Sequence, residues 1–476
     1  MQVYRPISFH ILQNRSKISA IRNFLEGDRI LGNRRSTKPY WMKLFPVIRK
    51  DEAGRTDKKE TGDFQPVPDA KTAAAKGLLP LLGPAFVAAV AYVDPGNVAA
   101  NITAGARYGY LLVWVLVLAN LMAVVIQYQS AKLGLVTGKS LPEILGDRLP
   151  KAKRIAFWLQ AEIIAAATDL AEIVGGAIAL QLLFGLPLLA GGSIVGCVSL
   201  VLLVFQNERR QKQFESIVIA LLAIITVGFL SGLVISPPDP VGVLGGLIPR
   251  FAGTDTVLIA ASMLGATVMP HAIYLHSSLV NHRFPQRKPG DLPNLLRASK
   301  HDVAYALIVA GAVNIALLLL AASTLAGIDG TDTIKGAHAA IESALGNGIG
   351  VIFAIGLLAS GLASTSVGAY AGSEIMAGLL RIRVPLFLRR LVTLIPALLI
   401  LWLYPNPTWA LVISQVSLSF GIPLAVIPLA VYTRKSELMG KFSDTRAMSW
   451  VMGMISLLII ALNLLLAVLT FSGVDV

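Results

Sequence analysis

The sequence predicts an all-α membrane protein with eleven transmembrane helices. Only 14% of its 476 residues are charged, whereas soluble proteins carry about a quarter, and the mean hydropathy is +0.69. Apolar runs of about 20 residues, the length that crosses a bilayer, recur along the chain. Basic residues gather in alternate loops between these runs, as in multi-pass membrane proteins.

The apolar runs cover most of the chain after an initial polar segment. We expect helices at 78–106, 110–136, 154–184, 187–206, 214–236, 255–281, 302–326, 349–380, 385–403, 407–432 and 448–471. The preceding residues 1–76 are polar and basic, so we predict a largely disordered cytosolic tail followed by a transmembrane domain at 77–476. The tail lacks the apolar stretch of a secretory signal peptide.

Charge and cysteine content exclude some classes of protein. The single cysteine, Cys197, permits no intramolecular disulfide and no cysteine-based metal cluster. Outside the tail, most basic residues lie in short loops between apolar runs, so we expect no nucleic-acid partner.

The loop charges predict the orientation. With the amino terminus inside, each predicted inner loop carries three to five Lys or Arg, whereas the outer loops carry only Arg107, Arg250 and Lys335. Basic loops stay on the cytoplasmic side. We therefore expect a multi-pass protein of the cytoplasmic membrane, with a cytosolic amino terminus and an external carboxyl terminus.

The first predicted helix is interrupted by polar residues. Its apolar run meets Asp94, Pro95, Gly96 and Asn97 in consecutive positions. An ionisable group inside a bilayer costs several kcal/mol, roughly 2.5–3.5 on insertion scales. Broken backbone persists at that depth only where it lines a protein-enclosed cavity. The segment therefore indicates a functional site.

The sixth predicted helix is interrupted in the same way, by Met269, Pro270 and His271. One proline in a membrane helix is more often a kink than a site. Breaks in the first and sixth helices, however, indicate two five-helix units, at about 77–236 and 255–432, with an extra helix at about 448–471. Because five is odd, the second unit is inverted, and paired breaks of this kind point to a transporter's binding site.

The residues at the two breaks predict a site for a divalent transition metal. Asp94, Asn97 and the carbonyl of Ala91 supply oxygen, and Met269 and the carbonyl of Ala266 supply sulfur and oxygen. A lone methionine is usually a core filler, but a thioether beside an anionic oxygen favours Mn²⁺ or Fe²⁺ over Ca²⁺ and Mg²⁺.

The sequences DPGN at residues 94–97 and MPH at 269–271 resemble the signatures of the Nramp family, the natural resistance-associated macrophage proteins. The resemblance extends from about residue 77 to the end and is strongest to the bacterial manganese-transporter branch. It implies proton-coupled divalent metal transport and the inverted five-plus-five leucine-transporter fold. It also implies metal ligation by Asp94, Asn97, Met269 and the carbonyls of Ala91 and Ala266, and in some states by Gln415.

Three carboxylates share one face of the third predicted helix: Glu162, Asp169 and Glu172. Arg389 and Arg390 at the start of the ninth helix are candidate partners. One interpretation is a static salt bridge between the two helices. The other, which the resemblance favours, is a proton relay in which Arg390 pairs with the Asp169–Glu172 segment, while Asp94 is both ligand and proton acceptor.

Other polar residues lie within the predicted helices. His271 is next to the second break and is a candidate for proton passage or gating, whereas His276 is as readily a hydrogen-bonded structural residue. Gln127, Asn314 and Asn120 are candidates for an outer path or gate, or for hydrogen bonds between helices.

These observations together predict a proton-coupled symporter that imports Mn²⁺ or Fe²⁺ by alternating access. The metal is substrate and the proton is the coupling ion, so we expect no prosthetic group, and we expect a functional monomer. The alternatives are a sodium-coupled symporter for an organic solute, a metal-dependent membrane enzyme and a passive metal channel. The enzyme is disfavoured because the chain has no HExxH, GxSxG or Walker-type motif.

Overall fold

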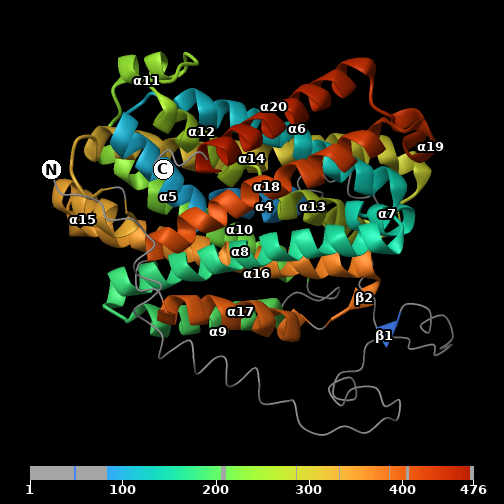
Figure 1. The fold of residues 1–476 in the computed structure, drawn as a ribbon, viewed down its shortest axis with the longest axis horizontal. Coiled ribbons are helices and arrows are strands. Elements are labelled where there is room, and N and C mark those ends of the chain that lie inside the picture. Colours follow the sequence, from blue (N-terminus) through green and yellow to red (C-terminus); the bar gives the residue numbers. More distant parts are fainter. Residues whose placement is uncertain are drawn as a thin grey trace, which may run out of the picture. The chain divides into compact units, whose positions relative to one another are not determined.

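Helices account for nearly all of the ordered architecture (Figure 1). The computed structural model describes residues 48–49, 83–204, 211–285, 287–331, 333–384, 386–403 and 407–471. The predicted tail at 1–76 lies outside these residues, except for Ile48 and Arg49. Those two form strand β1 (Ile48–Arg49), which pairs antiparallel with β2 (Ile382–Arg383).

Each predicted apolar run overlaps one helix or, at the two predicted breaks, two or three helical segments. In chain order these are α4 (Pro84–Val90), the 3₁₀ helix η3 (Ala91–Val93), α5 (Pro95–Tyr108), α6 (Val113–Thr137), α8 (Lys151–Phe184), α9 (Leu188–Val204), α10 (Gln211–Ile235), α12 (Thr254–Thr267), α13 (Pro270–Arg283), α14 (Leu292–Thr324), α16 (Asn347–Leu380), α17 (Leu386–Leu403), α18 (Pro407–Arg434) and α20 (Arg446–Phe471).

The loops contain further short helices that apolar runs do not reveal. They are α7 (Leu141–Arg148), α11 (Pro240–Gly246), η4 (Pro289–Asp291), α15 (Ile334–Leu345), α19 (Ser436–Met439) and η5 (Gly440–Phe442). In α7 the sequence provides a capping box: the Ser140 side chain accepts from the Glu143 backbone, and Glu143 accepts from Ser140.

Length and composition support a membrane protein. Within the described residues, seven helical segments are long and apolar enough to cross a bilayer: Val113–Thr137, Lys151–Phe184, Gln213–Ile235, Thr254–Arg283, Pro289–Thr324, Asn347–Leu380 and Arg446–Leu465. Shorter apolar helices lie at Pro84–Val93, Leu188–Leu202 and Leu418–Arg434.

One boundary differs clearly from the sequence prediction. Helix α14 begins at Leu292, ahead of the predicted 302. Its polar first turns still bury Leu295, Leu296 and Ala298 against Leu135 of α6. A search for continuous apolar runs stops at the charged residues here, whereas an amphipathic helix continues through them.

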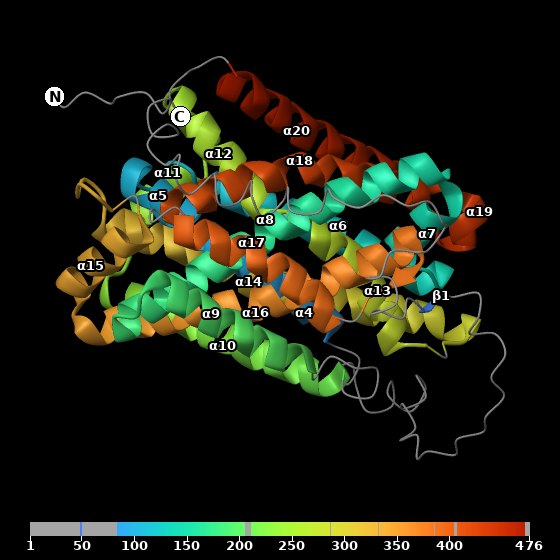
Figure 2. The same ribbon diagram turned by 60° about the horizontal axis from the view of Figure 1, so that its bottom comes forward.

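The longest helices form the centre of the packing. Helices α8 and α10 both pack against α16 (Figures 1 and 2). The two halves of each broken helix share a neighbour: α4 and α5 both pack on α14, and α12 and α13 both pack on α6. A buried cluster that contains Ala91, Met269 and Ala272 joins the two interrupted segments to this centre.

The contact between α8 and α16 depends on small residues. A Cβ atom at Gly361 of α16 would lie 3.0 Å from the backbone nitrogen of Gly176 and 3.1 Å from the carbonyl oxygen of Glu172. We expect Gly361→Ala to lower the thermal unfolding midpoint in detergent, because over-packing a buried contact typically costs about 1–3 kcal/mol.

Gly453 of α20 is the matched control, because a Cβ atom there meets nothing within 4 Å. Gly453→Ala should leave the midpoint unchanged or raise it slightly, since alanine is the better helix former. An equal loss in both variants would contradict the close approach of α8 and α16.

Candidate metal and proton site

At the first break, a new helix begins inside a buried region. After η3, Asp94 adopts an extended conformation (φ −69°, ψ 165°) and is the N-cap of α5, with Pro95 in the first helical turn. The Asp94 Oδ1 atom accepts hydrogen bonds from the Asn97 backbone nitrogen and from Asn97 Nδ2, both at 2.9 Å. Proline is compatible with this position because its missing N–H would have no partner in the helix.

The second break repeats this arrangement. Helix α12 ends at Thr267, Val268 and Met269 leave the helical conformation, and Pro270 begins α13 with Met269 as its N-cap. Met269 provides no side-chain cap. Its thioether is instead fully buried within the cluster that contains Ala91.

The two breaks meet at the side chain of Asn97. Its Nδ2 atom donates to the Ala266 carbonyl oxygen at 2.7 Å as well as to Asp94 Oδ1. Thr267 Oγ1 donates to Asn97 Oδ1 at 3.4 Å. Two oxygens from different helices therefore accept hydrogen bonds from one buried amide, and the structure brings Asp94, Asn97 and Ala266 together.

Gln415 of α18 lies against the same segment. A Cβ atom on Gly96 would overlap the Gln415 amide and would lie 3.0 Å from Asp94 Oδ2. Glycine is therefore required at position 96 for this close approach. In the part of the chain that the structure describes, Asp94 Oδ2 is buried without a hydrogen-bond partner.

Two side chains bind the backbone carbonyls that η3 exposes. Asn314 Nδ2 donates to the Tyr92 carbonyl at 2.7 Å, and Ser360 Oγ donates to the Val93 carbonyl at 2.5 Å. Asn314 Oδ1 also accepts a hydrogen bond from Asn101 Nδ2 at 2.9 Å. Asn314 is thus placed at the first break, next to the backbone of η3. Sequence reasoning missed Ser360, whose signal is the row of hydroxyl residues in apolar α16: Ser360, Ser364, Thr365 and Ser366.

Two ion pairs join α8 to α17. Arg390 Nη1 lies 2.9 Å from Asp169 Oδ1, and Arg389 Nη2 lies 2.8 Å from Glu162 Oε1. Arg390 is fully buried, and its Nε atom also donates to Ser199 Oγ of α9. Glu172 is fully buried one helical turn beyond Asp169. The predicted carboxylate face of α8 therefore lies against both predicted arginines of α17, and each arginine pairs with a different carboxylate.

The histidines have different surroundings. His276 Nδ1 is 2.8 Å from Gln127 Oε1, and Gln127 Nε2 donates to the Tyr92 hydroxyl at 2.7 Å. This chain links α13 through α6 to η3. His271 is also buried, and neither of its ring nitrogens has a hydrogen-bond partner among the described residues.

Asn120 is placed differently from the other predicted polar residues. Its amide lies against Gly311 of α14, and no hydrogen bond within the described residues joins it to either break. Asn120 therefore lies at the contact between α6 and α14.

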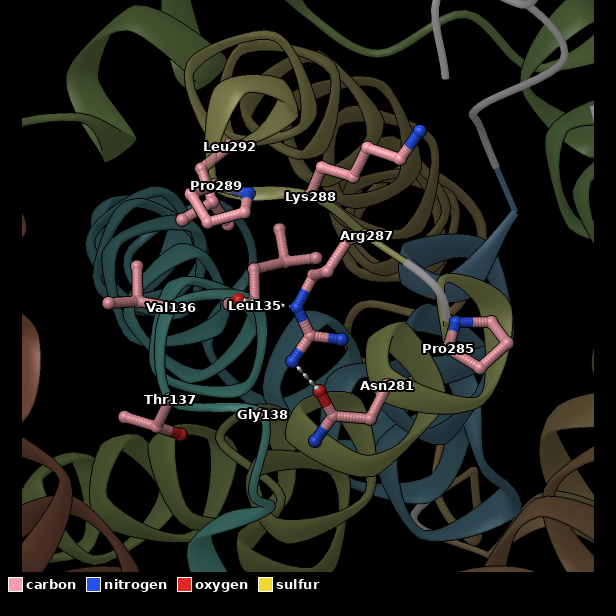
Figure 3. A pocket seen from close by; sticks show the side chains of 10 residues that line it. All are labelled: Leu135, Val136, Thr137, Gly138, Asn281, Pro285, Arg287, Lys288, Pro289 and Leu292. Atoms are coloured by element: carbon pink, nitrogen blue, oxygen red, sulfur yellow. Dashed lines mark hydrogen bonds between the residues drawn. The ribbon is translucent and has the colours of Figure 1, made fainter. Parts of the chain in front are cut away.

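A cavity of about 510 Å³ lies at the ends of α6 and α13, and it shares no residue with the two breaks (Figure 3). Arg287 extends into it and donates to the Leu135 and Gly134 carbonyls at 2.6 and 2.9 Å and to Asn281 Oδ1 at 2.9 Å. Burial lowers the pKa of the Arg287 guanidinium. These bonds satisfy the carbonyls at the end of α6, so we assign Arg287 a structural role there.

Comparison with known proteins gives one consistent result. Residues 85–469 match the family described as natural resistance-associated macrophage protein-like. The divalent metal cation transporter MntH of Mycobacterium tuberculosis H37Rv is 55% identical over 394 residues, which are 83% of this chain and 92% of that protein. MntH of Bacillus subtilis strain 168 is 43% identical over 430 residues, covering 89% of this chain and 100% of that protein.

A solved structure is similar over most of the chain. The manganese transporter of Eremococcus coleocola, in complex with an aromatic bis-isothiourea compound, is 30% identical with a TM-score of 0.76. The match covers 88% of this chain and 91% of that one. These relatives are named as transporters, not as enzymes. The matches extend over most of the chain, and the two interrupted helices agree with them. The chain belongs to the Nramp family.

Proposed function

We propose that this protein is a proton-coupled symporter that imports divalent transition-metal ions, Mn²⁺ and Fe²⁺, across the cytoplasmic membrane by alternating access. The observation that carries the proposal is the convergence of Asp94 Oδ1 and the Ala266 carbonyl on the Asn97 amide. Oxygens from two interrupted helices meet there in a buried place, which is the arrangement of a transporter's ion site.

Several observations support a metal ion as the substrate. The proposed ligands are the side chains of Asp94, Asn97 and Met269 and the carbonyls of Ala91 and Ala266, with Gln415 joining in some states. For Asn97 to ligate through oxygen, its amide must rotate and release Ala266. The relatives are named as divalent metal cation and manganese transporters. Sulfur beside hard oxygen favours Mn²⁺ and Fe²⁺ over Ca²⁺.

The coupling proton has a candidate route along α8. Asp94 binds it next to the metal, and Glu172, Asp169 and Glu162 follow along one face of α8. The ion pairs Asp169–Arg390 and Glu162–Arg389 hold opposite charges next to this path. In this proposal His271 assists proton passage near the second break. His276 holds the hydrogen bonds that run through Gln127 to Tyr92.

The proposed topology is the eleven-helix leucine-transporter fold. Residues 77–236 and 255–432 are its inverted repeats, and α20 is the extra helix. The loops that contain Gly138, Arg287 and Arg381 lie at the same end of the helices. Arg287 approaches Gly138, and Asp147 pairs with both Lys139 and Arg381. These basic loops support a cytosolic location for that end, with residues 1–76 as a cytosolic tail.

The membrane potential assists import. One elementary charge that crosses 100 mV gains about 2.3 kcal/mol, so a divalent cation has a large inward drive before any proton moves. We take the monomer as the functional unit, because both breaks and both ion pairs lie within one chain.

Asp94→Asn tests the metal site. We expect Mn²⁺ uptake into proteoliposomes to fall by more than about tenfold, because the only charged ligand is lost and each 1.4 kcal/mol of binding is a factor of ten. Asp255→Asn, at an exposed position in the first turn of α12, is the matched control and should transport normally. Full uptake by Asp94→Asn would refute the assignment.

Met269→Ala tests the contribution of sulfur to selectivity. We expect this variant to retain Mn²⁺ uptake but to admit more competition by Ca²⁺ and Mg²⁺, since oxygen ligands alone suit hard ions. Met263→Ala removes another fully buried thioether from α12 and should keep the wild-type competition profile. Equal Ca²⁺ competition in the wild type and Met269→Ala would contradict the role of the thioether.

Asp169→Asn tests the coupling. We expect metal-dependent proton flux, measured with a pH-sensitive dye inside proteoliposomes, to fall more than Mn²⁺ binding. Asp147→Asn removes a surface ion pair with Arg381 instead and should change neither. If Asp169→Asn lost proton flux and metal binding equally, a static salt bridge would be the better interpretation of the Asp169–Arg390 pair.

A further inference from the structure

A polar cluster joins α13 to α16 near the end of α13. Ser278 and His282 lie one helical turn apart on α13, and Tyr370 and Glu374 lie one turn apart on α16. Residues four apart share one face of a helix. Two polar side chains from each helix therefore meet across this contact, and none of the four belongs to the proposed metal site or proton route.

Hydrogen bonds orient the cluster. Ser278 Oγ donates to Glu374 Oε2, and His282 Nδ1 lies 2.8 Å from the Tyr370 hydroxyl. The Tyr370 ring stacks with the imidazole at an interplanar angle of 9°, and it meets the Phe214 ring of α10 edge-on. An imidazole whose Nδ1–H donates to such a fixed acceptor presents the lone pair of Nε2 on its other side.

The Nε2 atom of His282 faces the Glu374 carboxylate across a short gap. It lies 4.0 Å from Glu374 Oε2, which is too long for a hydrogen bond. An ion such as Zn²⁺ binds imidazole nitrogen and carboxylate oxygen at about 2.1 Å each, so it spans ligand atoms up to about 4.2 Å apart. At a tetrahedral angle the two atoms are about 3.4 Å apart, which a small side-chain rotation provides. The pair therefore fits one metal ion.

The cluster is enclosed on one side and open on the other. Tyr370 is 5% exposed and Ser278 is 3% exposed, whereas the side chains of His282 and Glu374 are 33% and 21% exposed. A hydrated ion therefore reaches both ligand atoms, and water completes its shell. Hard divalent ions are commonly held in this way, by one or two protein ligands and several waters. Such a site binds reversibly.

The local charges favour a cation. Glu374 supplies a negative charge, and His282 lies in the last turn of α13, where the backbone carbonyls favour positive charge. The adjacent Arg283 is paired with Glu215 at 3.5 Å, so its charge is compensated. Imidazole nitrogen suits Zn²⁺ and Fe²⁺, and carboxylate oxygen suits Mn²⁺. The ligand pair therefore indicates a divalent transition metal.

The cluster lies on the same helix as the second break. His282 is thirteen residues beyond Met269, which corresponds to about 20 Å at 1.5 Å per residue. Helix α13 then ends and leads into the loop that contains Arg287, at the basic end that we propose to be cytosolic. An ion that leaves the two breaks along α13 therefore meets this cluster at the end of the helix.

We infer that His282 and Glu374, with the Ser278 hydroxyl, form a second divalent transition-metal site at the cytosolic end of α13. Its ligands are His282 Nε2 and the Glu374 carboxylate, and Tyr370 is a positioning residue that holds Nδ1. The cytosolic location and the identity of the ion rest on the proposed function, whereas the ligand atoms are defined by the contacts between α13 and α16.

Mn²⁺ binding to the purified full-length protein in detergent, with a tag free of histidine, tests the site. Asp94→Asn removes the charged ligand between the breaks, where no histidine ligand is proposed. Pulsed electron paramagnetic resonance of bound Mn²⁺ should therefore still show coupling to one imidazole nitrogen. Adding His282→Ala should abolish that coupling. Adding Glu374→Gln or Tyr370→Phe should weaken Mn²⁺ binding at least about tenfold, the usual cost of losing a ligand or the group that orients it.

His338→Ala is the matched control. His338 of α15 also lies near a carboxylate, with Nδ1 3.8 Å from Glu342 Oε2, but its Nε2 is engaged with the Gly350 carbonyl at 3.0 Å. This change should leave the nitrogen coupling intact. Coupling that persisted in His282→Ala, or that His338→Ala removed instead, would overturn the site. His282→Gln serves if His282→Ala does not fold.

An imported ion and a free cytosolic ion would bind through the same atoms, and uptake into proteoliposomes distinguishes them. Slower uptake by His282→Ala into empty proteoliposomes supports an imported ion. Relief, in His282→Ala, of the slowing that preloaded internal Mn²⁺ causes supports a cytosolic ion. Uptake equal to the wild type in both arms would overturn any part for the site in transport.

The same measurements separate this inference from the proposed function. If the wild type did not transport Mn²⁺ but the nitrogen coupling depended on His282, the proposed function would fail and the site would stand. If the wild type transported Mn²⁺ and Asp94→Asn showed no nitrogen coupling, the site would fail and the proposed function would stand.

Discussion

The arrangement of this molecule depends on one constraint: backbone groups freed by a helix break inside a membrane must find partners in the protein. At the first break, Asp94 binds the backbone and side chain of Asn97, Asn314 binds the carbonyl of Tyr92, and Ser360 binds that of Val93. These contacts draw α14 and α16 around η3. The elements that surround the site are therefore the same elements that make the break stable.

The same constraint explains why charge is concentrated between α8, α16 and α17. A buried arginine is stable only with an opposite charge and hydrogen-bond acceptors close by. Arg390 has Asp169 and Ser199, and Arg389 has Glu162. The carboxylates face protein instead of lipid because α8 packs along α16 throughout this region. Packing, ion pairing and the proposed proton path are thus parts of one arrangement.

Much of this could be predicted from sequence, because the dominant signals are local. Apolar length predicted the helices, and the prolines at 95 and 270 predicted where two of them are interrupted. The spacing of Glu162, Asp169 and Glu172 placed them on one face, and the basic doublet in α17 supplied their partners.

The features that sequence did not predict are mostly contacts between distant segments. Nothing in the local pattern connects Ser360 with Val93, or Ser199 with Arg390, because each contact depends on how helices dock. The early start of α14 was missed because its first turns are amphipathic. The sequence did not distinguish Asn120 from Gln127 and Asn314, yet the Asn120 amide faces Gly311. The rotation of each helix about its axis decides which of its polar residues points to the centre.

The pair of Asp169 and Arg390 also bears on how the chain enters the membrane during synthesis. On insertion scales a charged residue at the centre of a lone helix costs roughly 2.5–3.5 kcal/mol. Asp169 is made early, whereas Arg390 appears near the end of the chain. The carboxylates of α8 therefore have no positively charged partner until α17 has been synthesised. We expect the early helices to stay beside the insertion machinery or in loose contact with water, so that the charged centre assembles as one of the last steps of folding.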